Sequence, residues 1–153
     1  MPKIIVEPVE GGKVPKFANP TDACADCYLR YVFQAQSNNQ ATHVFAYNLL
    51  AIPPGETITV QLGFKMQLEE GWEGLIRGRS GLAQKGLQVH PGTIDHLYRL
   101  EVGAVLHNAG QRTIFLEAGE RVCQLAIRRV DKVVFEVGEV EETAREGFGS
   151  TGR

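Results

Sequence analysis

The sequence predicts an all-β fold, a sandwich or barrel of short strands, on three observations. Apolar residues alternate with polar ones or form short runs, as expected for strands. Turn signals rich in glycine and proline separate these runs at roughly ten-residue spacing, which is typical of sandwiches and barrels. No segment carries a long helical period. A length of 153 residues suits one domain with a sizeable core.

Each predicted element follows from its local pattern. Strands are expected over residues 3–9, 57–68, 113–116, 122–128 and 132–140. The clearest is 57–68, whose alternating apolar residues share one face: Ile58, Val60, Leu62, Phe64 and Met66. Turns are expected at residues 11–12, 53–55, 71–74, 110–112 and 118–120, and one short helix at residues 82–86. The polar run 34–40 predicts that segment 32–45 forms a hairpin with a mobile tip.

Charge and composition argue against several classes of function. The net charge is -2, whereas nucleic-acid binders usually show a clear basic excess. No apolar run approaches the ~20 residues that span a membrane, and residues 1–14 do not resemble a signal peptide. We therefore expect neither a nucleic-acid nor a membrane partner. An odd count of three cysteines without a secretion signal predicts reduced thiols in a cytosol-like compartment.

Cys24 and Cys27 have the Cys-x-x-Cys spacing of many zinc and redox sites. No second pair of this kind follows, and Cys123 with any of the histidines matches no common zinc module. On a regular strand, positions 24 and 27 would point to opposite faces. We therefore expect packed thiols, with structural zinc as the alternative.

The stretch 89–108 combines a turn, an acid, an aromatic residue and an apolar strand, which together suit a small-molecule site on a β-hairpin. Asp95 follows the turn glycine Gly92 and lies beside Ile94. An ionised carboxylate in a partly hydrated pocket there would polarise a water molecule for attack. The alternative is an aspartate that only caps a turn.

Two further segments suit anion binding. The tripeptide Arg79-Ser80-Gly81 would bind phosphate oxygens through exposed backbone N–H groups, a hydroxyl and a guanidinium. The same tripeptide also fits a plain turn. The glycine-rich tail 147–152 allows close backbone approach to an anion, and its Phe148 would stack on a planar ring. A disordered C-terminus is the alternative there. No cysteine or serine with a paired base is apparent, which favours direct attack by water over a covalent intermediate.

Five segments resemble, in order, the five motifs of the trimeric dUTPase family. They are TDACADC, GRSGLAQKG, GTIDHLYR with the downstream VLHN, AGERVCQL and REGFGSTG, and they cover the chain from about residue 20 to its end. The resemblance implies a jelly-roll-like distorted barrel or sandwich that assembles as a homotrimer, with residues of all three subunits in each active site. It divides the chain into a β domain of residues 1–140, with an insertion at about 31–45, and a mobile C-terminal arm of residues 141–153.

The reaction that the resemblance implies is hydrolysis of dUTP to dUMP and pyrophosphate with Mg²⁺, which limits uracil incorporation into DNA and supplies dUMP. Asp95 would activate the water that attacks the α-phosphorus, and Tyr98 would leave no room for a ribose 2′-hydroxyl. Asp26 would bind Mg²⁺ through water, in keeping with the waters that this ion retains. The other implied substrate-binding residues are Gly92, Thr93 and Ile94 for uracil, Arg79, Ser80, Gly81 and Gln124 for the triphosphate, and Arg145, Phe148, Gly149, Ser150 and Thr151 of the arm.

Several positions depart from the family's usual pattern. Leu97 and Leu100 stand where the third motif usually has an acid and a glycine, and Cys24 stands at a usual glycine of the first motif. In the fifth motif only two residues separate Arg145 from Phe148, so Arg153 is an alternative for the arginine of the arm.

Two other functions share the fold that the resemblance implies. A dCTP deaminase would carry a glutamate where this chain has Val105, and ammonia release from dCTP would reveal it. A nucleotide-gated regulatory protein would bind a protein partner through the insertion at 31–45. Pull-downs with and without a non-hydrolysable dUTP analogue, repeated after deletion of residues 34–40, discriminate that role. The expected location is cytoplasmic, or the host-cell cytoplasm or nucleus for a viral protein.

Overall fold

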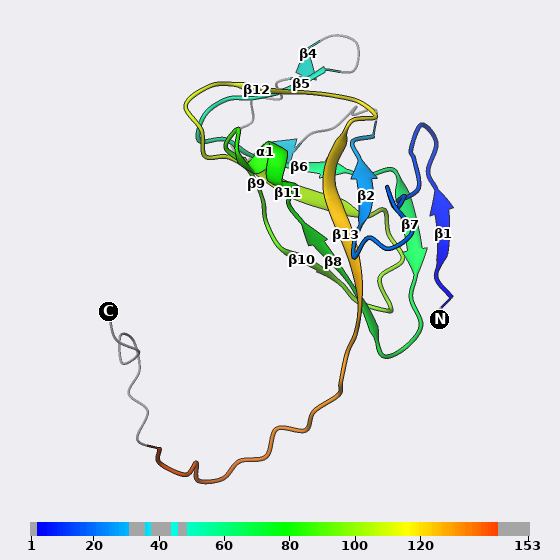
Figure 1. Cartoon of the computed structure of the whole chain (residues 1–153), viewed down its shortest axis with the longest axis vertical. Helices are drawn as coiled ribbons and strands as arrows, with labels where there is room; N and C mark the ends of the chain where they lie inside the picture. Colours follow the sequence, from blue (N-terminus) through cyan, green and yellow to red (C-terminus); the bar gives the residue numbers. More distant parts are fainter. Residues whose placement is uncertain (1–2, 31–35, 38–43, 46–48, 144–153) are drawn as a thin grey trace.

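The computed structural model describes residues 3–30, 36–37, 44–45 and 49–143 (Figure 1). These residues form short strands and one short helix, so the predicted all-β class is confirmed. In chain order the elements are β1 (Ile5–Pro8), β2 (Ala25–Tyr28), β3 (Gln36–Ser37), β4 (Val44–Phe45), β5 (Leu49–Ile52), β6 (Thr57–Gln61), β7 (Phe64–Gln67), β8 (Trp72–Arg77), α1 (Ser80–Ala83), β9 (Leu87–Val89), β10 (Gly92–Ile94), β11 (Gly103–Asn108), β12 (Ile114–Glu117) and β13 (Arg121–Arg129).

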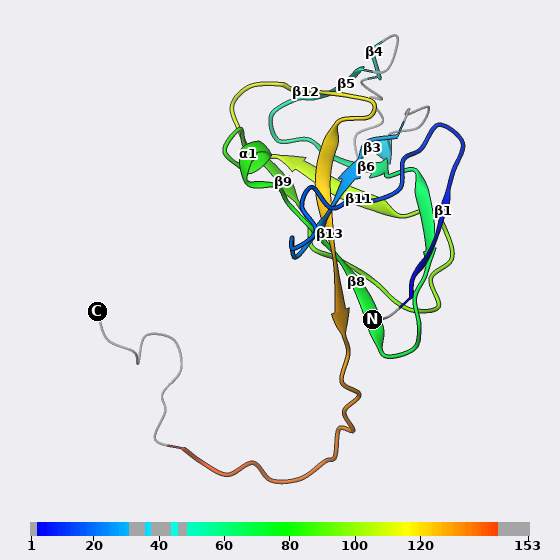
Figure 2. The same ribbon diagram turned by 45° about the vertical axis from the view of Figure 1, so that its right-hand side comes forward.

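The strands pair in antiparallel fashion into four small sheets that surround one core. The two larger sheets have the orders β10-β8-β13-β2 and β3-β6-β11-β9, and the smaller ones are β12-β5-β4 and β1-β7. β13 is the longest strand and runs through the middle of the body in both views (Figures 1 and 2). The core between the sheets is apolar, with Val60, Leu62, Phe64 and Leu106 fully buried.

The alternating segment 57–68 is buried as predicted, but it is not one strand. Its apolar face from Ile58 to Met66 lies in the core, with each of those side chains at most 5% exposed. The chain nevertheless leaves one sheet at Gln61 and enters another at Phe64. Gly63 makes this break because its φ is +80° and a Cβ there would lie 2.4 Å from Gly12 Cα. Burial therefore continues across a change of sheet.

Two local boundaries also differ from the expectations. The predicted turn 71–74 is confined to Gly71, since β8 already begins at Trp72 and runs through Gly74. Gly74 lies inside this strand, where a Cβ would lie 2.6 Å from Cε at the flexible end of Met66. The helix begins at Ser80 rather than at residue 82, and the Ala83 amide donates to Arg79 O at 2.9 Å.

The hairpin predicted in the stretch 89–108 is wrong, and the one predicted in the segment 32–45 lies mostly outside the described residues. In the segment 32–45, β3 pairs with β6 and β4 pairs with β5, so these two strands do not pair with each other. Its other residues, 32–35 and 38–43, lie outside the described ones. The stretch 89–108 is divided in a similar way: β9 pairs with β11, whereas β10 pairs with β8. Pro91 lies at this division and cannot donate to a ladder.

The predicted strand 132–140 is also wrong, because residues 130–143 form no strand. This segment leaves the body after β13 and extends away from it in both views (Figures 1 and 2). Val134 and Phe135 are each 94% exposed, because no strand of the described chain pairs with the segment. Among the described residues, no helix has the length and apolar character needed to cross a membrane.

Replacing Gly63 with alanine should lower the free energy of unfolding by about 3 kcal/mol, the sum of left-handed strain and a clash with the backbone of Gly12. Gly71→Ala is the matched control, because Gly71 has φ +83° but no atom within 4 Å of a Cβ. It should cost only about 1 kcal/mol. Urea unfolding at matched protein concentration measures both, and equal losses would contradict the role given to the Gly63–Gly12 contact.

Candidate functional site

One sheet carries four of the five motif segments of the sequence. Its strand β10 lies in the third segment, whereas β2 begins in the first and β13 begins in the fourth. β8 leads directly into the second segment. Gln124 on β13 lies opposite Asp26 on one side and opposite Arg77 on the other. Segments distant in the sequence therefore meet through strand register.

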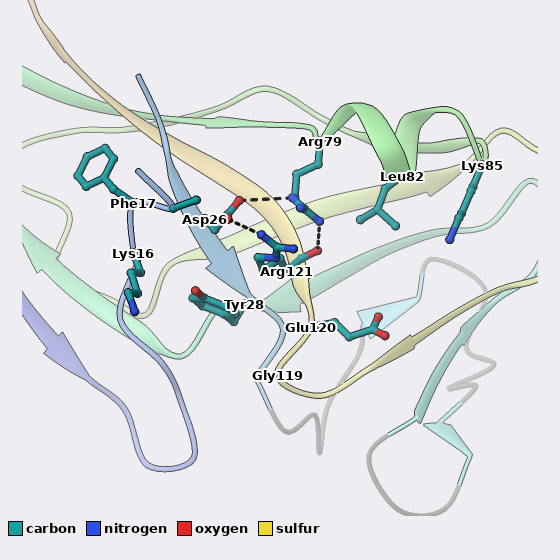
Figure 3. A pocket seen from close by; sticks show the side chains of 11 residues that line it. Lys16, Phe17, Asp26, Tyr28, Arg79, Leu82, Lys85, Gly119, Glu120 and Arg121 are labelled. Atoms are coloured by element: carbon teal, nitrogen blue, oxygen red, sulfur yellow. Dashed lines mark hydrogen bonds and ion pairs between the residues drawn. The ribbon is translucent and has the colours of Figure 1, made fainter. Parts of the chain in front are cut away.

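A buried carboxylate lies at the centre of this arrangement. Asp26 is 5% exposed, and its oxygens lie 3.4 Å from Arg79 Nε and 3.2 Å from Arg121 Nη1. The Gln124 side-chain amide donates to Asp26 Oδ1 at 3.2 Å. Arg79 Nη1 also donates to Arg121 O at 2.9 Å, so the second and fourth segments are joined directly (Figure 3). Three side chains from two neighbouring elements thus compensate the buried charge of Asp26.

An open pocket of about 650 Å³ lies above this cluster. The cations Lys16, Arg79, Lys85 and Arg121 line it, against the carboxylates of Asp26 and Glu120 (Figure 3). Four positive charges and two negative ones favour an anionic ligand. Phe17 and Leu82 add apolar surface to the same wall. The pocket therefore suits a molecule that combines phosphate groups with a less polar part.

Ser80 and Gly81 lie beside this pocket, at the start of α1. Both are exposed, and a Cβ on Gly81 would meet no atom within 4 Å. A ligand can therefore approach their backbone closely, as the sequence predicted for a phosphate cradle. The structure brings Arg79, Ser80 and Gly81 to the same place as Asp26 and Gln124.

Asp95 and Tyr98 belong to a second group, at the opposite edge of the sheet. Asp95 directly follows β10 and is exposed, and its backbone oxygen accepts from the Tyr98 amide at 3.0 Å. The Tyr98 hydroxyl donates to Glu101 O at 2.9 Å. The residues Gly92, Thr93 and Ile94 form β10 itself. The carbonyl rather than the carboxylate of Asp95 closes this turn, which leaves the carboxylate facing solvent.

The sheet register keeps these two groups apart within one chain. Ile94 lies opposite Gly74, which lies three residues along β8 from Arg77, the partner of Gln124. Three residues span ~10 Å and the three strand spacings from β10 to β2 span ~14 Å, so about 17 Å separate Ile94 from Asp26. Within one chain, the predicted site residues therefore form two separate groups at opposite edges of the sheet.

The remaining predicted residues cannot be placed. Arg145, Phe148, Gly149, Ser150 and Thr151 lie outside the described residues, as does the alternative arginine Arg153. Most of the insertion at 31–45 also lies outside them, so a protein partner there stays a prediction.

Arg121 is a site residue that the sequence did not reveal. On a regular strand, residues 121 and 124 point to opposite faces. A register shift between Arg121 and Cys123 interrupts this alternation of side chains. Both Arg121 and Gln124 therefore reach Asp26. The motif AGERVCQL contained the arginine, but its spacing from Gln124 gave no sign of a shared target.

Cys27 and Cys123 are packed thiols behind the site, whereas Cys24 is only partly buried. Cys27 and Cys123 lie opposite each other on β2 and β13, both buried, and all three cysteines are free. A hydrogen bond with Cys123 and burial raise the pKa of the Cys27 thiol. Within the described chain, no three side chains of histidine, cysteine, aspartate or glutamate form a group that could hold a metal ion.

Comparison with known proteins gives a consistent picture. The family model for dUTPase matches residues 29–152. The deoxyuridine 5′-triphosphate nucleotidohydrolase of Hydrogenobaculum sp. is 42% identical over 127 residues, covering 78% of this chain and 88% of that protein. The protein of the same name from Rhizobium etli is 44% identical over 109 residues, covering 67% of this chain and 70% of that protein.

Solved structures show the same fold at lower identity. A dUTPase of Staphylococcus bacteriophage 80alpha with dUpNHpp has a TM-score of 0.79 and 20% identity, covering 98% of each chain. The dUTPase of phage phi11 of S. aureus, described with a structural Mg(II) ion, has a TM-score of 0.71 and 20% identity, covering 92% of this chain and 97% of that one. The predicted jelly-roll-like fold is thereby confirmed.

Neutralising the buried carboxylate should destabilise the fold. We expect Asp26→Asn to lower the free energy of unfolding by about 2 kcal/mol, because Arg79 and Arg121 then face a neutral amide in a buried site. Glu7→Gln disrupts the exposed pair with Lys65 and should change it by less than about 0.5 kcal/mol. Denaturant titration distinguishes them, and an Asp26→Asn loss no larger than that of the control would contradict the cluster's structural role.

Proposed function

The chain belongs to the dUTPase family, and we propose that it hydrolyses dUTP to dUMP and pyrophosphate by attack of water on the α-phosphorus. The observation that carries this proposal is the cationic pocket around Asp26, where three of the five motif segments converge. The relatives named deoxyuridine 5′-triphosphate nucleotidohydrolase support the choice of substrate. Such an activity would limit uracil incorporation into DNA and supply dUMP.

The pocket around Asp26 is the proposed triphosphate half of the site. Arg79 and Arg121 supply charge, Gln124 supplies an amide, and the backbone at Ser80 and Gly81 is open to close approach. Hydrolysis of a phosphoanhydride depends chiefly on neutralised charge and on an aligned water molecule. These residues would bind and orient the triphosphate so that its α-phosphorus is presented to that water.

Asp26 fits an indirect role toward Mg²⁺. A carboxylate has about four acceptor positions, and Arg79, Arg121 and Gln124 already use three at Asp26. One position remains, which suits a hydrogen bond to a water molecule of the ion better than direct coordination. Mg²⁺ keeps several waters and takes the rest of its ligands from phosphates. When bound, it would neutralise further charge on the triphosphate.

The loop after β10 is the proposed uracil, sugar and water half. The exposed carboxylate of Asp95 would hold and deprotonate the attacking water. The ring of Tyr98 would lie against the deoxyribose and exclude a 2′-hydroxyl, and β10 would read uracil through backbone groups of Gly92, Thr93 and Ile94. The arm residues Arg145, Phe148, Gly149, Ser150 and Thr151 would close over the ligand.

We further propose that the two halves meet between subunits of a homotrimer. The separation of about 17 Å along the sheet supports this, because it places the two halves at opposite edges of the sheet within one chain. The apolar side chains of Val134, Phe135 and Val137 are almost fully exposed in the single chain, which also favours a neighbouring subunit that covers them. Three free cysteines support a reducing, cytoplasmic location.

The direct test is release of pyrophosphate from dUTP, dCTP, dTTP and UTP, each with and without Mg²⁺. We expect turnover of dUTP alone, and strongly reduced turnover without the ion. Asp95→Asn should lower kcat for dUTP by about 10³-fold with little change in binding, because a general base contributes 10²- to 10⁴-fold.

The exposed acid Glu10, replaced by glutamine, is the matched control and should keep full activity. Ammonia release from dCTP, or equal turnover of all four nucleotides, would overturn the proposed function. Retained turnover by Asp95→Asn would remove this residue from the mechanism.

A further inference from the structure

Glu101 lies at the base of the loop that carries Asp95 and Tyr98, and its carboxylate points back into the body. Glu101 Oε1 lies 2.7 Å from Arg30 Nε and accepts from the Gly63 amide at 3.0 Å. The Glu101 side chain is 17% exposed and that of Arg30 is 26% exposed. Arg30 Nε has no well-aligned acceptor among the described residues, so this contact is a charge pair rather than a directed hydrogen bond.

The body side of this contact is rigid. Gly63 is held at φ +80°, its carbonyl accepts from the Val9 amide at 2.9 Å, and a Cβ on it would lie 2.4 Å from Gly12 Cα. Arg30 lies two residues after the end of β2, and its amide donates to Gln61 O at 3.1 Å. The carboxylate of Glu101 is therefore fastened to two points that are fixed by the backbone.

The loop side depends on Glu101 as well. The hydroxyl of Tyr98 donates to the backbone oxygen of Glu101, and the amide of Tyr98 donates to the backbone oxygen of Asp95. Next to it, Leu97 and Leu100 are 74% and 69% exposed, so little of the described chain packs over this loop. Tyr98 itself is 39% exposed, and its hydroxyl bond to Glu101 is the polar contact that holds the end of the ring.

We propose that Arg30 and Glu101 form a positioning clamp that holds the Tyr98 ring against the sugar and so sets the discrimination between deoxyribose and ribose. This inference rests on the proposed function, in which Tyr98 contacts the sugar. Steric exclusion of a 2′-hydroxyl works only while the excluding ring cannot retreat. Glu101 joins that ring to the body, and neither Arg30 nor Glu101 belongs to the five-motif set of substrate residues proposed above.

The test compares kcat/KM for dUTP with kcat/KM for UTP in three variants of the full chain. Glu101→Gln keeps an acceptor for the Gly63 amide but removes the charge pair, and Arg30→Met removes the cation. Glu7→Gln is the matched control, because it breaks the exposed Glu7–Lys65 pair away from the loop. A ratio of the two constants is the right measure, since partial unfolding lowers both constants equally.

We expect the dUTP-to-UTP ratio to fall by at least about tenfold in Glu101→Gln and in Arg30→Met, because a displacement of ~1 Å can cost up to 10²-fold. The double variant should lose no more than the larger single loss, as expected for two residues of one unit. The control should keep the wild-type ratio.

An unchanged ratio in Glu101→Gln, or equal losses for both substrates, would overturn the clamp. If the wild-type chain itself fails to hydrolyse dUTP, the proposed function fails. If the wild-type chain hydrolyses dUTP and the variants keep its dUTP-to-UTP ratio, the clamp is rejected and the proposed function stands.

Discussion

The buried carboxylate of Asp26 is the interaction on which the rest of the site depends. A carboxylate at 5% exposure is costly unless it is paired, and here two guanidinium groups and one amide pair with it. These partners come from β13 and from the loop after β8, so the register of β2, β13 and β8 is tied to this charge. The same pairing holds Arg79 and Arg121 at the edge of an open pocket with an excess of positive charge.

The sheet that gathers the motif segments also separates them. Its strand order puts β10 at one edge and β2 at the other, so the proposed uracil and water half lies at the opposite edge from the proposed triphosphate half of the same chain. The exposed apolar side chains in the segment 130–143 likewise indicate that the single chain leaves apolar surface uncovered. Both features are resolved if the functional unit is an assembly of copies, as proposed above.

The sequence predicted what depends on local pattern, and it missed what depends on long-range geometry. Alternation correctly placed Ile58 and Met66 in the core, and the order of the motifs correctly indicated the family. The break at Gly63 was not predicted, because every second residue stays buried while the chain passes from one sheet to another. Arg121 was missed because the register shift next to it turns its side chain to the same face as Gln124. The strand at 132–140 had the right composition but has no partner within the described chain, so pattern alone could not decide its state.

The central claim is that each active site combines the Asp95 half of one chain with the Asp26 half of another. Refolding an equal mixture of Asp95→Asn and Arg79→Met chains tests it most directly, because each variant alone lacks one half of every site. Random assembly leaves about a quarter of the sites with both halves intact, so the mixture should recover about a quarter of the wild-type dUTP hydrolysis. Activity no higher than that of the two variants refolded separately would contradict the account.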